Sequence, residues 1–133
     1  STDELRKVHQ FVAFVAVTPI QHAIAEFLAS QPHYPSTLAQ EYQRRRDLFC
    51  NALTKSPFTF TPSAGTYFQL LDYSAISTAS DTQLCREWTE DRGIASIPVS
   101  VFYQQAPPQH LLRFCFAKRD DVLLEAAEIL CRI

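Results

Sequence analysis

Apolar residues alternate with other residues over Leu111–Phe116 and then recur at helical spacing as far as Leu130. In an extended chain Leu112, Phe114 and Phe116 share one face, which predicts a buried strand. The apolar positions of DDVLLEAAEIL, which follow, predict an amphipathic helix packed against that strand. We therefore predict a strand that leads into a helix over His110–Leu130.

The opposite face of this predicted strand carries Arg113 between Leu111 and Cys115. Taking an unpaired cation out of water costs several kcal/mol, so a guanidinium there needs an anionic partner or access to solvent. One interpretation is structural: an Asp or Glu of the same chain pairs with Arg113, or the side chain is half exposed. The other is functional: the planar guanidinium binds the carboxylate of a ligand through two parallel hydrogen bonds. The residue pattern alone leaves both interpretations open.

Helical spacing of apolar residues also dominates the first part of the chain. It predicts helices over Asp3–Val17, from Thr18 to Ala29, and from Ser36 to about Lys55. The sequence TPIQ predicts a capping box for the second helix, with Thr18 as N-cap, proline as the first helical residue and Gln21 as the reciprocal partner.

The middle of the chain changes to an extended pattern. Alternation around Phe58 and Phe60, and again over Thr66–Asp72, predicts a strand pair, with Gly65 at a position that requires positive φ or close backbone approach. Ser80 and Gly93 then mark the start and end of a helix. The fold class is therefore α+β, and the segments near 58–61, 67–72, 94–97 and 111–116 form a sheet with helices packed on one side.

Composition excludes several classes of function. The 133 residues suffice for one compact unit, and the net charge of −2 gives no footprint for nucleic acid. No apolar run approaches the ~20 residues of a membrane span. The four cysteines are widely spaced and form no C-x-x-C pair. Such spacing is typical of buried thiols in a reducing compartment, so we expect a cytoplasmic protein. The histidines show no metal-ligand spacing, so we expect no metal site. Two glycines cannot form a glycine-rich phosphate loop.

Four segments, in order, resemble one known family: KVHQFVAFVAVTPIQHAIAEFL, SAGTYFQLLDYS, DRGIASIPVSVFY and LLRFCFAKRDDVLLEAAEIL. They are similar to the C-terminal third of class I pyridoxal-phosphate aminotransferases (fold type I), most of all the methionine and kynurenine/glutamine transaminase branch. The resemblance implies an enzyme that transfers an amino group from an amino acid to a 2-oxo acid. It also implies that the chain is a piece of a longer polypeptide that acts as a homodimer.

The resemblance assigns Arg113 to binding of the substrate α-carboxylate. It places the Schiff-base lysine and the other principal cofactor residues upstream of Ser1, so no residue here is expected to be catalytic or to bind pyridoxal phosphate. Lys118 corresponds to a residue that merely follows the arginine strand. Residues 1–30 then resemble the end of the large cofactor domain and its subunit interface, 31–57 a connecting helix, and 58–133 the small C-terminal domain.

The resemblance also bears on the substrate. Family members that act on dicarboxylates carry a second arginine in the segment that corresponds to Phe11–Val17, which is wholly apolar here. We therefore expect an uncharged amino acid such as methionine, an aromatic residue or glutamine, with Phe14 and Tyr67 as side-chain contacts. Two alternatives share this resemblance: a pyridoxal-phosphate-dependent C–S β-lyase, and a non-catalytic aminotransferase-like sensor domain of a transcription regulator.

Overall fold

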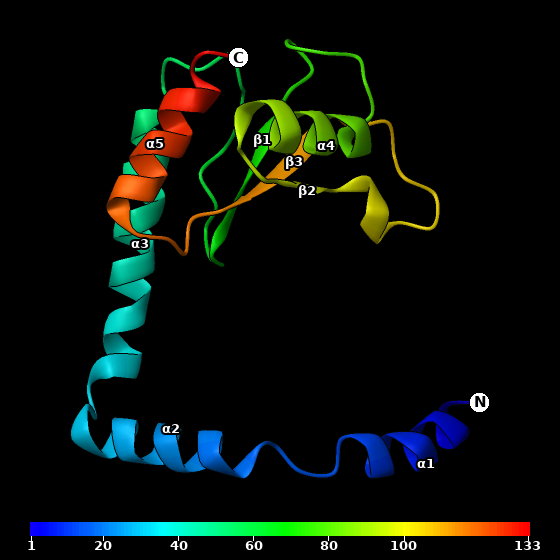
Figure 1. The fold of residues 1–133 in the computed structure, drawn as a ribbon, viewed down its shortest axis with the longest axis vertical. Coiled ribbons are helices and arrows are strands. Elements are labelled where there is room, and N and C mark those ends of the chain that lie inside the picture. The colour runs from blue at the N-terminus through cyan, green and yellow to red at the C-terminus, as the bar shows by residue number, and fades with distance from the viewer. The chain divides into compact units, whose positions relative to one another are not determined.

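The computed structural model describes residues 1–133 (Figure 1). Its elements are α1 (Thr2–Val12), α2 (Thr18–Ser30), α3 (Tyr34–Ala52), β1 (Phe68–Asp72), α4 (Asp81–Arg92), β2 (Ile97–Pro98), the 3₁₀-helix η1 (Ser100–Phe102), β3 (Leu111–Cys115) and α5 (Asp120–Leu130). The chain divides into two compact units, Ser1–Leu38 and Ala39–Ile133.

The sheet belongs to the Ala39–Ile133 unit and is antiparallel, with the strand order β1-β3-β2. This confirms the α+β class and the strand around Arg113. The segments near 58–61 and 94–97 were expected as full strands, which is wrong: the first contributes only the Thr59–Asp72 bridge, and of the second only Ile97 pairs with β3. Near 58–61 the reason lies in the side chain of Gln69, which donates to the Thr61 carbonyl and accepts from the Ser63 amide in place of a backbone ladder.

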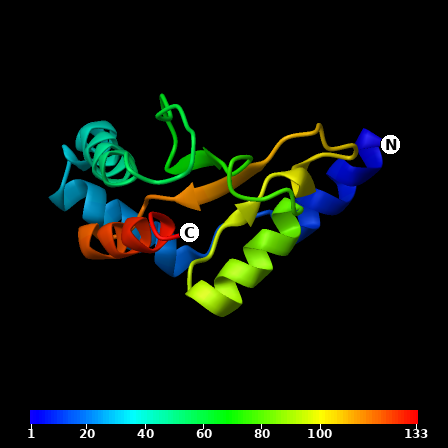
Figure 2. The same ribbon diagram turned by 90° about the horizontal axis from the view of Figure 1, so that it is seen from above.

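One face of the sheet forms the core of this unit. Alternation along β3 buries Leu112 and Phe114, as predicted, while Arg113 is only half buried on the other face. Helices α3, α4 and α5 all contribute to the cluster on the buried face, and Figure 2 shows α4 and α5 against the sheet from a second direction. Helix α5 does so through Leu123, Ala127 and Leu130, spaced as an amphipathic helix requires. The helices therefore leave the Arg113 face of the sheet free.

Helix α4 begins and ends as its sequence predicts. The Ser80 hydroxyl accepts a hydrogen bond from the Gln83 amide, and Gly93 ends the helix with φ of 67°. Such a left-handed conformation suits glycine because it has no Cβ to meet the backbone. Gly65, by contrast, was wrongly expected to need positive φ or close backbone approach: the neighbouring Thr66 has φ of 77° instead, and a Cβ at Gly65 would meet no atom within 4 Å.

The two N-terminal helices form, but their boundaries differ from those expected. Helix α1 ends at Val12 rather than Val17, and three of the five residues that follow, Phe14, Val15 and Val17, have weak helix propensity. The predicted Thr18 cap is also wrong: Val17 is the N-cap residue of α2 and no side chain caps the helix. The Gln21 amide nitrogen instead donates to the carbonyl oxygen of Ala16 at 2.8 Å.

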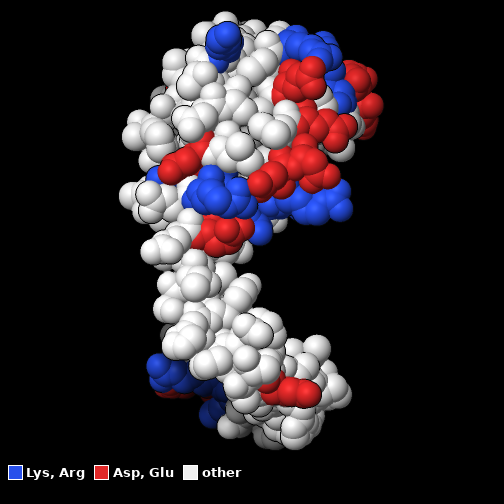
Figure 3. Space-filling model, turned by 90° about the vertical axis from the view of Figure 1, so that its left-hand side faces the viewer, with Lys and Arg blue, Asp and Glu red and all other residues white.

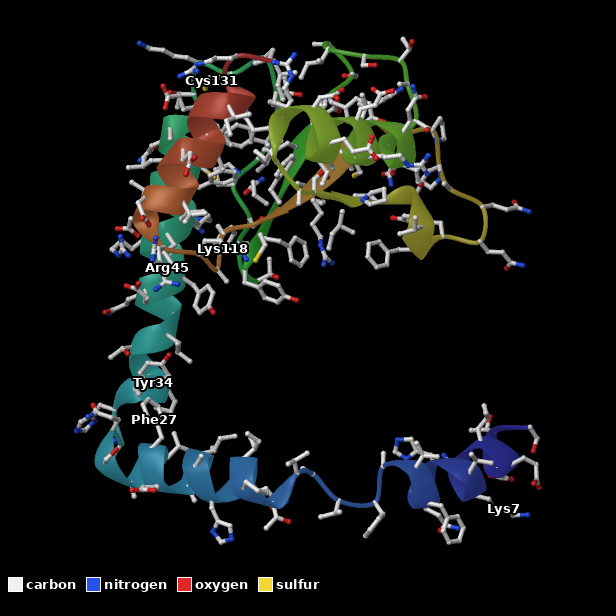
Figure 4. All side chains as sticks on the ribbon, in the orientation of Figure 1. Lys7, Phe27, Tyr34, Arg45, Lys118 and Cys131 are labelled. Atoms are coloured by element: carbon white, nitrogen blue, oxygen red, sulfur yellow. The ribbon has the colours of Figure 1, made fainter.

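Helix α3 begins at Tyr34, two residues before the expected Ser36 cap. The Ser36 hydroxyl donates to the His33 carbonyl rather than accepting from the helix, so it does not act as an N-cap. The rings of Phe27 and Tyr34 meet edge to face, with centroids 5.0 Å apart, at the corner between α2 and α3 (Figure 4). This contact packs the first turn of α3 against the end of α2.

Two further findings bear on the expectations from composition. Cys50 and Cys85 are buried as predicted, whereas Cys115 is exposed because it lies on the Arg113 face of β3. None of the helices combines the length and the hydropathy that a membrane crossing would require.

Candidate functional site

Arg113 occupies the middle of the central strand, where both neighbouring strands fix its backbone. It lies opposite Leu70 of β1 and Ile97 of β2. The pleat directs its side chain away from the core residues Leu112 and Phe114. The strand thus holds a cation on the open face of the sheet.

Two aromatic rings cover the Arg113 guanidinium. Its central carbon lies 4.6 Å from the ring centroid of Phe68 and 5.4 Å from that of Phe102, both within the range of a cation–π interaction. Phe68 pairs with Cys115 in the register, so it is the diagonal neighbour of Arg113 on the same face. Phe102 reaches the guanidinium from η1. We call these three residues the Arg113 clamp.

Arg113 forms no ion pair with a carboxylate of the Ala39–Ile133 unit. Rings that cover the π-faces of a guanidinium leave its N–H edge available, and that edge carries all its hydrogen-bond donors. The internal ion pair is therefore wrong, whereas the half-exposed side chain of the structural interpretation is observed. The ligand interpretation stays a prediction: the N–H edge can bind a planar, bidentate anion such as a carboxylate.

A pocket of about 370 Å³ adjoins this strand. Its walls come from α3, from β3, from the segment that enters β2 and from the first turns of α5, and they include the core residues Phe49 and Phe114. Most of the lining is apolar, while Arg113 and Lys118 supply positive charge. Neither ring of the Arg113 clamp lines this pocket, so it is not the space beside the two rings.

The structure brings Tyr67 close to the clamp. Its ring meets Phe68 edge to face with centroids 5.6 Å apart, and its carbonyl accepts a hydrogen bond from the Phe116 amide. Its side chain remains 49% exposed, so it is accessible to a ligand. Phe14 belongs to the Ser1–Leu38 unit, where it lies between α1 and α2 and is 80% exposed.

Sequence reasoning missed both rings of the clamp. Phe68 could have been found from the register, because a residue diagonal to Arg113 on the neighbouring strand faces the same way. The signal for Phe102 was weaker: a cluster of aromatic residues, VSVFY, in a segment otherwise interpreted as a loop.

The lysines of this chain do not fit the role of a Schiff-base nucleophile. Lys7 is exposed and pairs with Glu4 at 3.0 Å, and Lys55 is exposed just after α3. Lys118 lines the pocket, but it too is exposed, in the turn between β3 and α5 (Figure 4). An aldimine lysine is activated by desolvation or by a neighbouring cationic group in a closed site. No lysine of this chain therefore meets the condition for an aldimine with pyridoxal phosphate.

The Ala39–Ile133 unit is a small α+β domain that presents an arginine on the open face of its sheet. Residues 2–130 match the family model for aminotransferases of class I and II, and the chain belongs to that family. Members of this family depend on pyridoxal phosphate and act on amino acids and 2-oxo acids.

Comparison with individual proteins gives the same family. The chain is 45% identical to a methionine aminotransferase of Escherichia coli over 94% of its length, which is 32% of that relative. It is 33% identical to a kynurenine–oxoglutarate transaminase of Dictyostelium discoideum, over 97% of this chain and 34% of the relative. A crystal structure of an Escherichia coli protein with methionine aminotransferase function superposes with a TM-score of 0.83 at 44% identity, covering 98% of this chain and 35% of that one. The chain thus spans about a third of the length of the relatives it matches.

Proposed function

We propose that this chain is the C-terminal part of a pyridoxal-phosphate-dependent aminotransferase that moves an amino group from an uncharged amino acid to a 2-oxo acid. The observation that carries the proposal is the Arg113 clamp: a half-buried guanidinium without an ion pair in its own unit, covered by two rings. The similarity to a methionine aminotransferase supports the choice of substrate class. In the whole enzyme we expect a homodimer.

Arg113 has a positioning role in this proposal. Two parallel N–H···O bonds to the α-carboxylate fix both the location and the plane of that group. Holding a substrate in one reactive orientation converts binding free energy into rate. The residues that hold the cofactor lie, in this proposal, in the part of the longer polypeptide upstream of Ser1.

The division of the chain follows from the same proposal. Residues 1–30 belong to the end of the large cofactor domain, 31–57 connect, and 58–133 form the small domain that carries Arg113. Phe14 and Tyr67 contact the substrate side chain, and their apolar rings favour methionine or an aromatic amino acid over aspartate.

The test uses the longer polypeptide that carries these residues, with its cofactor. Replacing Arg113 by Ala should lower kcat/KM for methionine, mostly through a higher KM. The expected loss of transition-state stabilisation is about 2–5 kcal/mol, because one partner of a desolvated charge pair is lost. Arg113→Lys should recover only part of this loss, since an ammonium cannot form two parallel bonds in one plane. Arg92→Ala is the matched control, because Arg92 is an exposed arginine in the last turn of α4.

An Arg113→Ala variant with the kcat/KM of the unmodified enzyme would refute the role of Arg113. Faster turnover of aspartate than of methionine or phenylalanine would refute the apolar side-chain pocket. Release of ammonia and pyruvate from cysteine S-conjugates, without amino transfer, would identify a β-lyase instead.

A further inference from the structure

Asp81 is a buried carboxylate that the site described above does not use. Only 6% of its surface is exposed, and it forms no ion pair within the Ala39–Ile133 unit. Three hydrogen bonds donated to its carboxylate stabilise the negative charge instead. Oδ1 accepts from the Ser100 hydroxyl at 2.7 Å and from the Thr82 amide at 2.8 Å, and Oδ2 accepts from the Ser100 amide at 2.7 Å.

Two of these bonds tie the start of α4 to η1, nineteen residues further along the chain. Bonds to an ionised acceptor are roughly twice as strong as those between neutral groups. Burial alone would raise the pKa of Asp81, but the bonds from Ser100 and from the Thr82 backbone outweigh it, so this pKa lies below its ordinary value. Asp81 therefore remains an anion that holds both hydrogen-bond donors of Ser100.

Ser100 begins the turn that carries Phe102, the second ring of the clamp. Phe102 is 61% exposed and its neighbours Val101 and Tyr103 are 59% and 48% exposed, so packing around this turn is sparse. Val99 is buried and anchors the turn at one end. The Asp81–Ser100 bonds supply the next attachment, two residues before the ring that covers Arg113.

We propose that Asp81 is a positioning residue for Arg113: its carboxylate holds Ser100, which places Phe102 over the guanidinium and restricts the directions in which the N–H edge can point. The consequence for substrate affinity rests on the proposed function, whereas the positioning itself does not.

A purely structural alternative is that Asp81 only stabilises the first turn of α4. The Ser80 hydroxyl already accepts a hydrogen bond from the Gln83 amide as the cap of that helix, so the first turn of α4 does not depend on Asp81 alone. Ser100→Ala separates the two roles, because it removes the hydroxyl that binds Asp81 and leaves the Asp81–Thr82 bond of α4 in place.

The first measurement is nuclear magnetic resonance of the isotopically labelled 133-residue chain. The Nε–H signal of Arg113, assigned by its loss in Arg113→Lys, should carry ring-current shifts from Phe68 and Phe102. Phe102→Ala defines the shift that Phe102 contributes. We expect Asp81→Asn to lose most of that shift, because an amide donor would then face a donor of Ser100. Ser100→Ala should lose part of it, and Ser100→Thr, which keeps the hydroxyl, should restore it.

Asp91→Asn is the control, an exposed carboxylate on the same helix that should leave the Arg113 signal unchanged. An unchanged Arg113 shift in both Asp81→Asn and Ser100→Ala would overturn the proposal. If Asp81→Asn fails to fold, Ser100→Ala and Ser100→Thr still decide between positioning and a merely structural role.

The second measurement is substrate affinity in the longer enzyme. Ser100→Ala should raise KM for the amino acid about 2- to 5-fold with little change in kcat, the range for losing one exposed cation–π contact. A lost ring-current shift with unchanged KM would leave the positioning role intact and would refute its consequence for substrate affinity, whereas the carboxylate role of Arg113 is decided by Arg113→Ala. The two proposals therefore fail in distinguishable ways.

Discussion

At the scale of single residues, the two glycines show that a glycine in the sequence does not by itself predict a left-handed backbone conformation. Gly93 has a left-handed conformation that ends α4, whereas Gly65 does not, and the positive φ in its loop falls on Thr66. A Cβ added at either glycine would meet no atom within 4 Å. The two positions therefore differ in backbone strain and not in packing.

This difference gives a matched pair of substitutions. Gly93→Ala should destabilise the chain by about 1 kcal/mol, because an L side chain in the left-handed region costs roughly that much. Gly65→Ala should be neutral or stabilising by up to about 1 kcal/mol, since it restricts only the unfolded chain. Urea unfolding followed by circular dichroism measures both changes, and equal effects would contradict the assigned backbone conformations.

Arg113 and Gln69 show which side chains of the site region were predictable. The face of Arg113 followed from alternation along one strand, and the structure confirms it. The hydrogen bonds of Gln69 were not foreseen, although it is 1% exposed, because its partners Thr61 and Ser63 lie in a loop whose path no periodic pattern describes. Asp81 was missed because its partner Ser100 is nineteen residues away in sequence.

At the scale of elements, a cluster of charged side chains joins α3 to α5. Arg44 donates to Glu41 one turn earlier and to Asp120 at the start of α5, at 3.0 and 2.8 Å. Acidic and basic side chains adjoin on the face of Ala39–Ile133 that Figure 3 presents. Hydrogen bonds from Arg44 and then Arg45 lower the pKa of Glu41 from an ordinary 4.5 to about 2, and the bond from Arg44 lowers that of Asp120.

These lowered pKa values determine a direction of pH dependence. A carboxylate with a depressed pKa stabilises the fold fully above its ordinary value and ceases to do so as the pH falls through its folded value. Stability should therefore decline as the pH falls from 4.5 towards 2, the interval given for Glu41. The decline should be small, because these groups are exposed and screened, and smaller again in high salt.

Asp120→Asn should flatten part of this acid dependence in thermal unfolding followed by circular dichroism. Glu125→Gln is its control, since Glu125 is exposed on the same helix and forms no ion pair. An equal acid dependence in Asp120→Asn and in the unmodified chain would contradict a stabilising link between α3 and α5.

Element boundaries were the least predictable part of the fold. The helix over Asp81–Arg92 follows its capping signals, and the helix over Asp120–Leu130 follows its apolar periodicity. The Thr18 cap does not form, because capping signals compete with other local hydrogen bonds such as that from Gln21 to Ala16. Within β2 the ladder ends at Pro98, which has no amide proton to continue it.

At the scale of the whole molecule, the Ser1–Leu38 unit exposes an unusual amount of apolar surface. No residue of α1 or α2 is buried. The side chains of Phe11, Phe14 and Ile24 are 78%, 80% and 53% exposed, and Figure 3 shows mostly uncharged atoms over this unit. Contiguous apolar surface of this kind drives association.

We therefore expect the 133-residue chain to self-associate through residues 5–28. Sedimentation velocity at several concentrations should show an oligomer, and Phe11→Glu together with Phe14→Glu should weaken it, since a charge cannot enter an apolar interface without cost. Leu124→Glu is the control, as Leu124 is 48% exposed on α5 and lies outside this surface. A strictly monomeric chain, or equal weakening by the control, would contradict this expectation.

A second expectation concerns the cofactor. The chain on its own should form no internal aldimine and should not transaminate, because its three lysines are exposed and no desolvated site activates them. Mixing the chain with pyridoxal phosphate and recording the absorbance spectrum tests this. A stable red-shifted band that methionine discharges would mean that a Schiff-base lysine lies within these residues.

The position of the single tryptophan allows the unfolding of the two units to be distinguished by spectroscopy. Trp88 is 7% exposed and its ring meets that of Phe58 edge to face, with centroids 5.8 Å apart, inside the core of Ala39–Ile133. Its emission therefore depends on the integrity of that unit alone, whereas far-ultraviolet ellipticity sums the helices of both units. Emission and ellipticity recorded along one denaturant gradient thus assign each transition to the unit that loses its structure.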